Sequence, residues 1–153
     1  MPSDVKLKID DIPRLRKKLD DLCDKANQAV LAKWSVILAK HILDFAQYDY
    51  SADEIVLAGF AVNENWQNGG ASVGDVRKAA FKVHELAKKS EDKLTKAALR
   101  VAGHAVATAH MKDHAIVASD YAIKAVNIKY TEDNFSVKQE RKWQINTLRV
   151  LTK

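Results

Sequence analysis

Residues 97–126 read AALRVAGHAVATAHMKDHAIVASDYAIKAV, and this stretch decides the fold class. It holds ten alanines, which favour a helix because alanine loses no side-chain entropy on folding. The helical pattern can break and restart around His110–Asp113. The stretch therefore predicts two helices, over about 94–110 and about 113–127, that form a hairpin at the heart of the fold.

Gly103 lies in the middle of the first of these helices. Glycine weakens a helix interior by about 1 kcal/mol relative to alanine, so its presence there calls for a packing reason. We therefore expect a tight crossing at Gly103 between this helix and a neighbour.

Helical periodicity extends outward from the hairpin through the rest of the chain. Pro13 suits the first turn of a helix, with Asp10 or Asp11 as its cap. Apolar residues at helical spacing form one stripe over about 30–45, which predicts a second helix. A segment with a basic face, over about 136–150, predicts the last helix.

Two capping-box sequences would begin the helices after residue 50. Ser51–Glu54 would begin a helix over about 52–68, in which hydroxyl and carboxylate groups satisfy the free N–H groups of the first turn. This helix is apolar on most sides through Val62, so we expect it to be central. It would end at Asn68–Gly70, and Ser72–Asp75 would begin the next helix.

The whole pattern predicts an all-α fold: a single compact domain over residues 1–153, with six or seven antiparallel helices and with residues 1–9 as its loosest part. Cys23 is the one cysteine, which excludes an intrachain disulfide and a zinc ribbon. The first residues lack the apolar core of a signal peptide, and no run of about 18 apolar residues occurs. We therefore expect a cytoplasmic protein with no membrane span.

The net charge of +5 is distributed unevenly along the chain. Residues 51–76 contain four acidic residues and no lysine or arginine, whereas the last helix is basic. The basic residues of that helix are Lys138, Arg141, Lys142 and Arg149. They are the candidates for nucleic-acid binding, but they lack aromatic interleaving and belong to no known nucleic-acid module. Nucleic acid is therefore not the expected partner.

The five histidines are the residues best suited to carry chemistry. His41 and His84 lie on apolar stripes, where a neutral imidazole normally bonds a polar neighbour and belongs to the core. His104, His110 and His114 are the candidate metal ligands. On one continuous helix, His110 and His114 would share a face and could chelate one ion, with a third ligand from elsewhere.

The sequence favours a structural interpretation of these three histidines over a metal site. Met111 stands where the HExxH signature of zinc proteases has its glutamate. Asp113 would cap the second helix, while one or more of the histidines would bond the free carbonyls and amides of the corner. We expect no cofactor and, since no catalytic motif appears, no enzyme. A metal-binding helical protein or a metal-dependent enzyme is the alternative.

The segment GHAVATAHMKDHAIVASDYAIKAV, residues 103–126, resembles the signature of the small helical "putative immunity protein" family of bacterial toxin–immunity systems. WSVILAKHILDF at 34–45 and NENWQNGG at 63–70 are similar to other parts of that family. The family's proline and Arg-Pro-Arg run between those parts is missing here, where the sequence is QYDYSADEIV. The resemblance implies a non-enzymatic protein that binds and neutralises a cognate toxin.

If the partner is a protein, the candidate contact surface is the acidic segment 51–76 together with the loop at 47–53. The candidate contact residues are Asp53, Glu54, Glu64 and Trp66. Among them, Trp66 beside the QNGG turn is the candidate for a partly exposed aromatic anchor. The isoelectric point of about 9.2 argues against simple charge mimicry of a nucleic acid, unless this acidic segment is the contact face.

Overall fold

The computed structural model describes residues 7–153 and is all-α, as the sequence predicts. The helices are α1 (Pro13–Lys25), α2 (Gln28–Phe45), α3 (Glu54–Gln67), α4 (Val73–Lys89), α5 (Lys93–Ala107), α6 (His114–Lys129) and α7 (Asn134–Leu151), with a 3-10 turn, η1 (Tyr50–Ala52), before α3. Residues 1–6, which belong to the stretch expected to be loose, lie outside the described residues. None of the helices within 7–153 has both the length and the apolar character of a membrane span.

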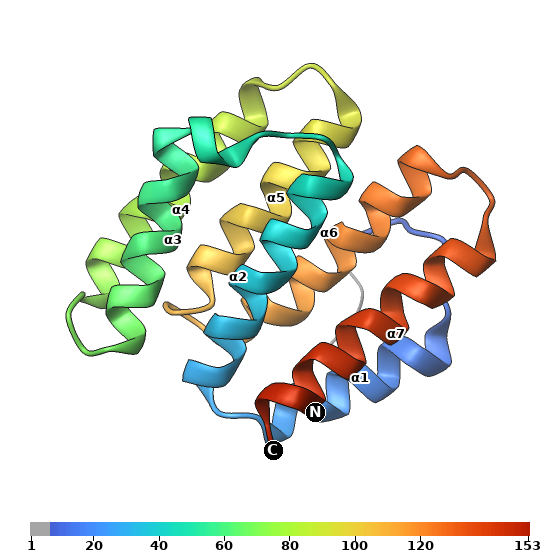
Figure 1. Ribbon diagram of the computed structural model, residues 1–153, viewed down its shortest axis with the longest axis horizontal. Helices are drawn as coiled ribbons and strands as arrows, with labels where there is room; N and C mark the ends of the chain where they lie inside the picture. The colour runs from blue at the N-terminus through green and yellow to red at the C-terminus, as the bar shows by residue number, and fades with distance from the viewer. Residues whose placement is uncertain (1–6) are drawn as a thin grey trace.

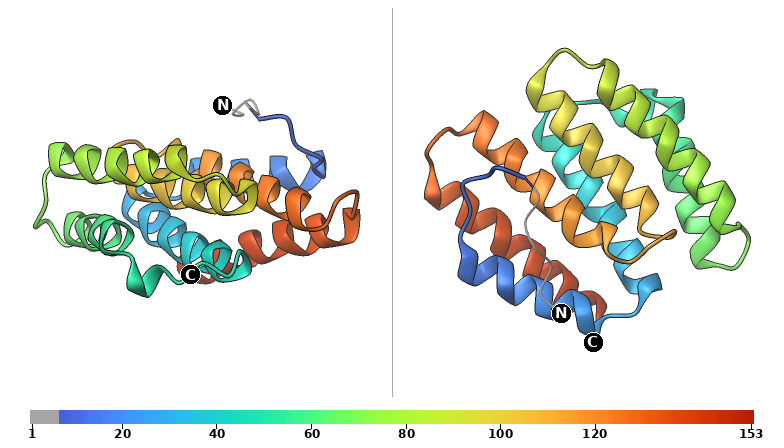
Figure 2. Two further views of the ribbon diagram at one scale, coloured as in Figure 1. Left: turned by 90° about the horizontal axis from the view of Figure 1, so that it is seen from above. Right: turned by 180° about the vertical axis from the view of Figure 1, so that it is seen from behind.

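The helices form two layers (Figures 1 and 2). Helices α3, α2 and α7 make the layer that faces the viewer in Figure 1, and α4, α5, α6 and α1 make the layer behind it. Neighbours within and between the layers pack against each other, most extensively α5 with α6, α4 and α2. The core therefore lies between the layers and centres on α5.

The predicted hairpin at the centre of the fold is confirmed. Helices α5 and α6 pack side by side, and all ten alanines of residues 97–126 are buried. Ala105, in the last turn of α5, has no exposed surface. Small side chains let the two helix backbones approach closely, which leaves room for α2 and α4 on the other sides of α5.

Helix α3 is not central, contrary to the expectation from its apolar sequence. Its main neighbour is α4, followed equally by α2 and α5. It lies at one edge of the molecule, and Ile55 and Leu57 are each 41% exposed. The alanine-rich helices α5 and α6 form the close-packed centre, so α3 lies at the periphery although its sequence is apolar. Its buried positions are Val56, Gly59, Phe60 and Asn63.

The start of α3 also differs from the prediction of a capping box at Ser51–Glu54. Gln47, with a φ of 58°, ends the preceding helix turn, and the chain then forms η1 before α3 begins. Asp53 is the N-cap, and its carboxylate accepts hydrogen bonds from the N–H groups of Ile55 and Val56. The second box is confirmed, because Ser72 and Asp75 bond each other's backbone N–H groups.

Neither Asp10 nor Asp11 caps α1. The N-cap is Ile12, which has no side-chain cap bond, and Pro13 occupies the first turn as predicted. The carboxylate of Asp11 instead accepts two hydrogen bonds from the guanidinium of Arg141, at 3.0 and 2.7 Å. The carboxylate of Asp11, which the local sequence pattern predicts as a helix cap, therefore binds the buried guanidinium of Arg141 instead.

An ion network, which we define as Asp11, Arg16, Asp120 and Arg141, joins α1, α6 and α7. Arg141 has no exposed side-chain surface, and its Nη2 lies 2.7 Å from Asp11 and 2.8 Å from Asp120. Arg16 donates to the same Asp120, at 2.9 and 3.2 Å. Ser119 and Gln144 accept from Nη1 of Arg141, so the buried guanidinium is fully engaged.

Candidate functional site

Four of the histidines lie where α4, α5 and α6 come together. His104 near the end of α5 and His114 at the start of α6 are joined by a hydrogen bond between their Nδ1 atoms, 3.0 Å apart. His110, in the corner between them, has its ring centroid 6.0 Å from that of His114. The fourth member is His84 of α4, whose ring meets that of His104 edge to face at 4.7 Å. We call His84, His104, His110 and His114 the histidine cluster.

His110 lies between two helices and His114 begins the second, so they do not share a continuous helical face. Helix α5 ends at Ala107 and α6 begins at His114. The free carbonyls at this corner accept hydrogen bonds from the side-chain amides of Asn63, which donates to Ala105 and Val106, and of Gln28. The prediction that the histidines would bond these carbonyls is therefore wrong.

Gln28 of α2 donates its side-chain amide to the carbonyls of Thr108 and Ala109, at 3.0 and 3.3 Å. Thr108 itself donates back to the carbonyl of His104. Asp113 is the N-cap of α6 by position, but its side chain makes no cap hydrogen bond. The backbone carbonyls of this corner are therefore hydrogen-bonded by amide side chains from distant helices, and not by the histidines and the aspartate that the local sequence predicted for the corner.

The tight crossing predicted at Gly103 is present, and the group that fills it is the imidazole of His84. A Cβ atom at position 103 would lie 2.5 Å from Cε1 of that ring, well inside any allowed contact. Arg100, one turn before Gly103, donates from Nη1 to Nδ1 of His84 at 2.9 Å. Arginine can only donate, so this nitrogen of His84 carries no proton.

His84, His104 and His114 of the histidine cluster are held in the neutral form. Burial, followed by the positive charges of neighbouring groups, lowers the pKa of His84 to about 4 and that of His104 to about 3. Burial and His110 also lower the pKa of His114, against the opposing effect of Asp113. These three histidines therefore carry little charge at neutral pH.

The geometry of the cluster is that of packed rings and not of a metal centre. Within the part of the chain that the structure describes, no three His, Cys, Asp or Glu side chains are placed to hold one metal ion. His104 and His114 share a hydrogen bond through the nitrogens that face each other, and Arg100 occupies Nδ1 of His84. Nothing in this arrangement favours the metal-binding alternative for His104, His110 and His114.

The four candidate contact residues of the acidic segment are spread along α3. Asp53 caps the helix and also accepts a hydrogen bond from the Tyr48 hydroxyl, so its carboxylate is committed to the local fold. Glu54 begins the helix, and Glu64, almost three turns later, lies 3.8 Å from Lys40. Trp66 is half-buried and packs against the core. Partner contact by these residues stays a prediction.

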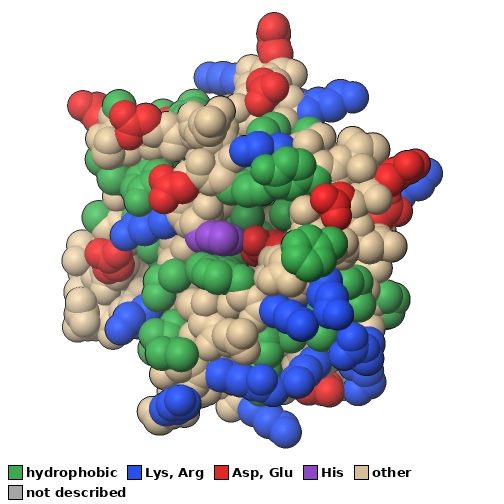
Figure 3. Space-filling model, turned by 45° about the vertical axis from the view of Figure 1, so that its right-hand side comes forward, with side chains coloured by type: hydrophobic (Ala, Val, Ile, Leu, Met, Phe, Trp, Pro, Cys, Tyr) green, Lys and Arg blue, Asp and Glu red, His purple; other side chains and the backbone are tan. Residues whose placement is uncertain are grey.

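A second polar site lies in a hollow of about 380 Å³ between α2 and α7. Nε2 of His41 lies 2.7 Å from the buried Glu140, and the imidazole stacks on Trp143 at 3.7 Å. Phe45 and the exposed Phe135 complete the rim. Hydrophobic side chains also gather around a histidine on the face drawn in Figure 3. His41 and His84 thus each bond a polar neighbour, as predicted, although both are only half-buried.

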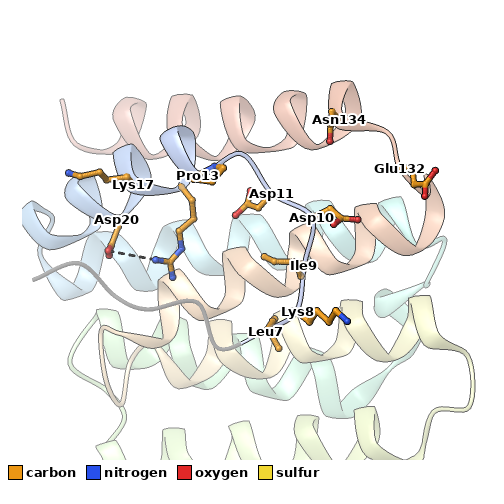
Figure 4. Close-up of a pocket in the computed structure, with 11 residues that line it drawn as sticks. Leu7, Lys8, Ile9, Asp10, Asp11, Pro13, Lys17, Asp20, Glu132 and Asn134 are labelled. Atoms are coloured by element: carbon orange, nitrogen blue, oxygen red, sulfur yellow. Dashed lines mark ion pairs between the residues drawn. The ribbon is translucent and has the colours of Figure 1, made fainter.

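A larger cavity, of about 870 Å³, lies between the N-terminal segment and α1 (Figure 4). Its lining combines Asp11, Arg16 and Asp20 with the chain around Ile9. Arg16 forms ion pairs with Asp20 and Asp120, and Asp11 binds Arg141. The buried charges at this cavity are therefore satisfied by one another and hold α1 in place.

Comparison with protein families gives a match over residues 21–150 to the family described as "Imm-5 like putative immunity protein". The chain belongs to this family. The match runs from the second half of α1 to the end of α7, and so includes both α3 and the histidine cluster. Searches of curated proteins and of solved structures found no match.

The structure also places two other groups of this member of the Imm-5-like family: one of the candidates for nucleic-acid contact and the single cysteine. Arg141, one of the four candidates for nucleic-acid contact, is buried in the ion network and cannot reach a phosphate backbone. Cys23 is also buried, and burial together with Asp20 and Asp24 raises the pKa of its thiol to about 12. A thiol with so high a pKa is not an activated nucleophile.

Proposed function

We propose that this Imm-5-like protein binds and neutralises a cognate toxin in the bacterial cytoplasm, without catalysing a reaction. Family membership over residues 21–150 supports the protein-binding class. The observation that carries the proposal further is the exposed apolar face of α3, an edge helix in the acidic part of the chain.

The exposed face of α3 has an apolar centre and acidic ends. Leu57, Ala58 and Ala61 are exposed, and Ala61 follows Leu57 by four residues and Ala58 by three, the spacings that make side chains neighbours on one side of a helix. Glu54 precedes them and Glu64 follows them on the same side, and α3 contains no lysine or arginine. A contiguous apolar face with charged residues at its rim is typical of a protein-binding surface.

The charge of this surface indicates the chemistry of its partner. A face that has glutamates at both ends suits a toxin surface that is apolar at its centre and basic at its rim. The ion pair between Glu64 and Lys40 would not prevent Glu64 from binding such a partner. Both side chains are largely exposed, and such pairs contribute only about 0–1 kcal/mol. The proposed contact face is therefore α3 with the turn η1 before it.

The test begins with the toxin domain encoded in the neighbouring open reading frame. This domain is expressed in a bacterial host with and without the chain, and growth is measured together with the Kd of the purified pair. We expect the wild-type chain to restore growth. If it neither restores growth nor binds the domain, the proposed function is contradicted.

The contact face is tested with Leu57→Arg and with the matched control Val150→Arg. Val150 is 65% exposed near the end of α7, so both changes put an arginine on the surface of a helix. We expect Leu57→Arg to weaken binding at least tenfold, because it breaks the apolar centre and adds charge opposite a basic partner, whereas Val150→Arg changes binding less than twofold. Equal binding by both variants, with equal melting temperatures, would refute the assignment of this face.

A further inference from the structure

A cavity of about 490 Å³ opens between α5 and α6 and is lined mainly by cations. Lys93, Lys96 and Arg100 of α5 form one wall, and Lys124 of α6 forms the other. Among the described residues, no aspartate or glutamate contributes to the lining. This volume lies within the range of roughly 300–1,000 Å³ that small-molecule sites occupy.

Arg100 is fixed in this wall by the histidine cluster. Its Nη1 donates to Nδ1 of His84, whose ring rests on the bare backbone of Gly103. Because the pKa of His84 is lowered to about 4, mainly by burial, this acceptor persists at neutral pH. The guanidinium keeps its other N–H donors, which form a planar fork suited to an anion with several oxygens.

The remaining wall offers apolar surface beside these charges. Tyr121 lines the cavity and stacks on His104, with ring centroids 5.2 Å apart and planes 18° apart. Ala97 and Ile128 complete this side. A ligand with an organic body as well as an anionic group would therefore find a surface for each part.

We propose that this cavity binds a small phosphate ester of the size of a nucleotide. Four cationic side chains with no acid in the lining favour a multiply charged anion, and a phosphate ester carries more negative charge than a single carboxylate. The phosphates lie against Arg100 and the three lysines, and the organic body lies against Tyr121. The site is in the layer opposite α3, so it is separate from the proposed toxin-binding face.

The site is tested by isothermal titration calorimetry of the full chain with ADP and with inorganic pyrophosphate, at about 50 mM salt. We expect saturable one-to-one binding of both probes. Tighter binding of ADP assigns a role to the apolar wall, and equal affinity assigns recognition to the phosphates alone; both results support the phosphate site. Absence of saturable binding of both probes at millimolar concentration would overturn it.

Two variants and a matched control distinguish this cavity from general attraction to a basic protein. Arg100→Gln and Lys124→Gln remove one charge from each wall, and Lys124 is exposed, so its replacement does not disturb the core. Arg77→Gln removes the same charge from an exposed site on α4 outside the cavity. We expect each cavity variant to weaken ADP binding at least tenfold and the control less than twofold. Equal losses in all three, as for nonspecific binding of polyanions, would contradict the proposal.

Discussion

The ion network and the histidine cluster are both buried polar groups, yet burial has opposite outcomes in the two. Burial opposes the charge of Arg141, but hydrogen bonds and attraction from Asp11 and Asp120 outweigh it and raise the pKa of the guanidinium. In the histidine cluster, burial acts together with the neighbouring cation Arg100 and lowers the pKa of His84 and His104. Desolvation alone does not decide ionisation; the charge of the partner does.

This difference explains how the two clusters stabilise the fold. The ion network depends on charge pairs that must all be present, because a lone buried ion is costly. The histidine cluster depends on ring packing, including the contact of His84 with Gly103, and on hydrogen bonds between neutral groups. Removing a charge should therefore disturb the ion network. Changing the shape of a side chain, or protonating a ring, should disturb the histidine cluster.

The largest effect is expected from Arg141→Met. This variant removes the cationic partner of Asp11 and leaves Asp120 with Arg16 alone, so we expect a loss of about 3–5 kcal/mol in the free energy of unfolding, measured by urea denaturation. Lys17→Met is the control, because its pair with Asp21 is largely exposed and should contribute about 0–1 kcal/mol. Similar losses in the two variants would mean that the ion network is no more important than a surface pair.

Gly103→Ala should have the next largest effect. The added methyl group would lie 2.5 Å from the ring of His84, and such overpacking costs about 1–3 kcal/mol. Gly74→Ala is the control, since its nearest neighbour would be at 3.7 Å and the change should stay within about 0.5 kcal/mol. In a Gly103→Ala, His84→Ala double variant, part of the loss caused by the added methyl should disappear. Strict additivity of the two changes would argue against the contact.

A smaller effect should appear in the pH dependence of stability. In the unfolded chain a histidine protonates near pH 6.5, but His84 and His104 stay neutral in the folded chain until about pH 4 and about pH 3. The unfolded state then binds more protons, so stability falls as pH falls through this window. Each such histidine should lower the free energy of unfolding by about 1 kcal/mol between pH 6.5 and 5.5.

This pH slope can be assigned by urea denaturation of the wild type and His104→Gln at several pH values. In the variant, the free energy of unfolding should fall less steeply with decreasing pH, because about one proton fewer is bound on unfolding. Asp11 does not contribute to this window, because Arg141 holds its carboxyl pKa below 3.8 against the effect of burial. An unchanged slope in His104→Gln would show that His104 titrates normally in the folded protein.

Local sequence predicted the parts of the fold that depend on local interactions. The alanines of residues 97–126 determine helix formation and close approach within one stretch, so the central hairpin was predictable. The capping box at Ser72–Asp75 spans four residues and was also predictable. Gly103 signalled a tight crossing, but the sequence could not show that the group filling it would be His84, nineteen positions earlier.

The errors arose where a distant residue competed for a local group. Asp11 binds Arg141, 130 positions away, and so does not cap α1. Gln28, some 80 positions from the corner, bonds carbonyls that had been assigned to the histidines. The apolar sequence of α3 indicated burial, but the closer packing of α5 and α6 left it at the edge. Periodicity describes one helix face, and tertiary packing decides what covers it.

The central claim is that the imidazole of His104 is neutral and structural, and an NMR titration of its side chain tests this most directly. The chemical shifts of its imidazole nitrogens are followed in the folded protein as pH is lowered. We predict that His104 remains neutral at pH 5, consistent with a pKa lowered to about 3, and keeps its shared hydrogen bond with His114. Protonation of His104 near its ordinary pKa of about 6.5, in a chain that is still folded, would contradict the account.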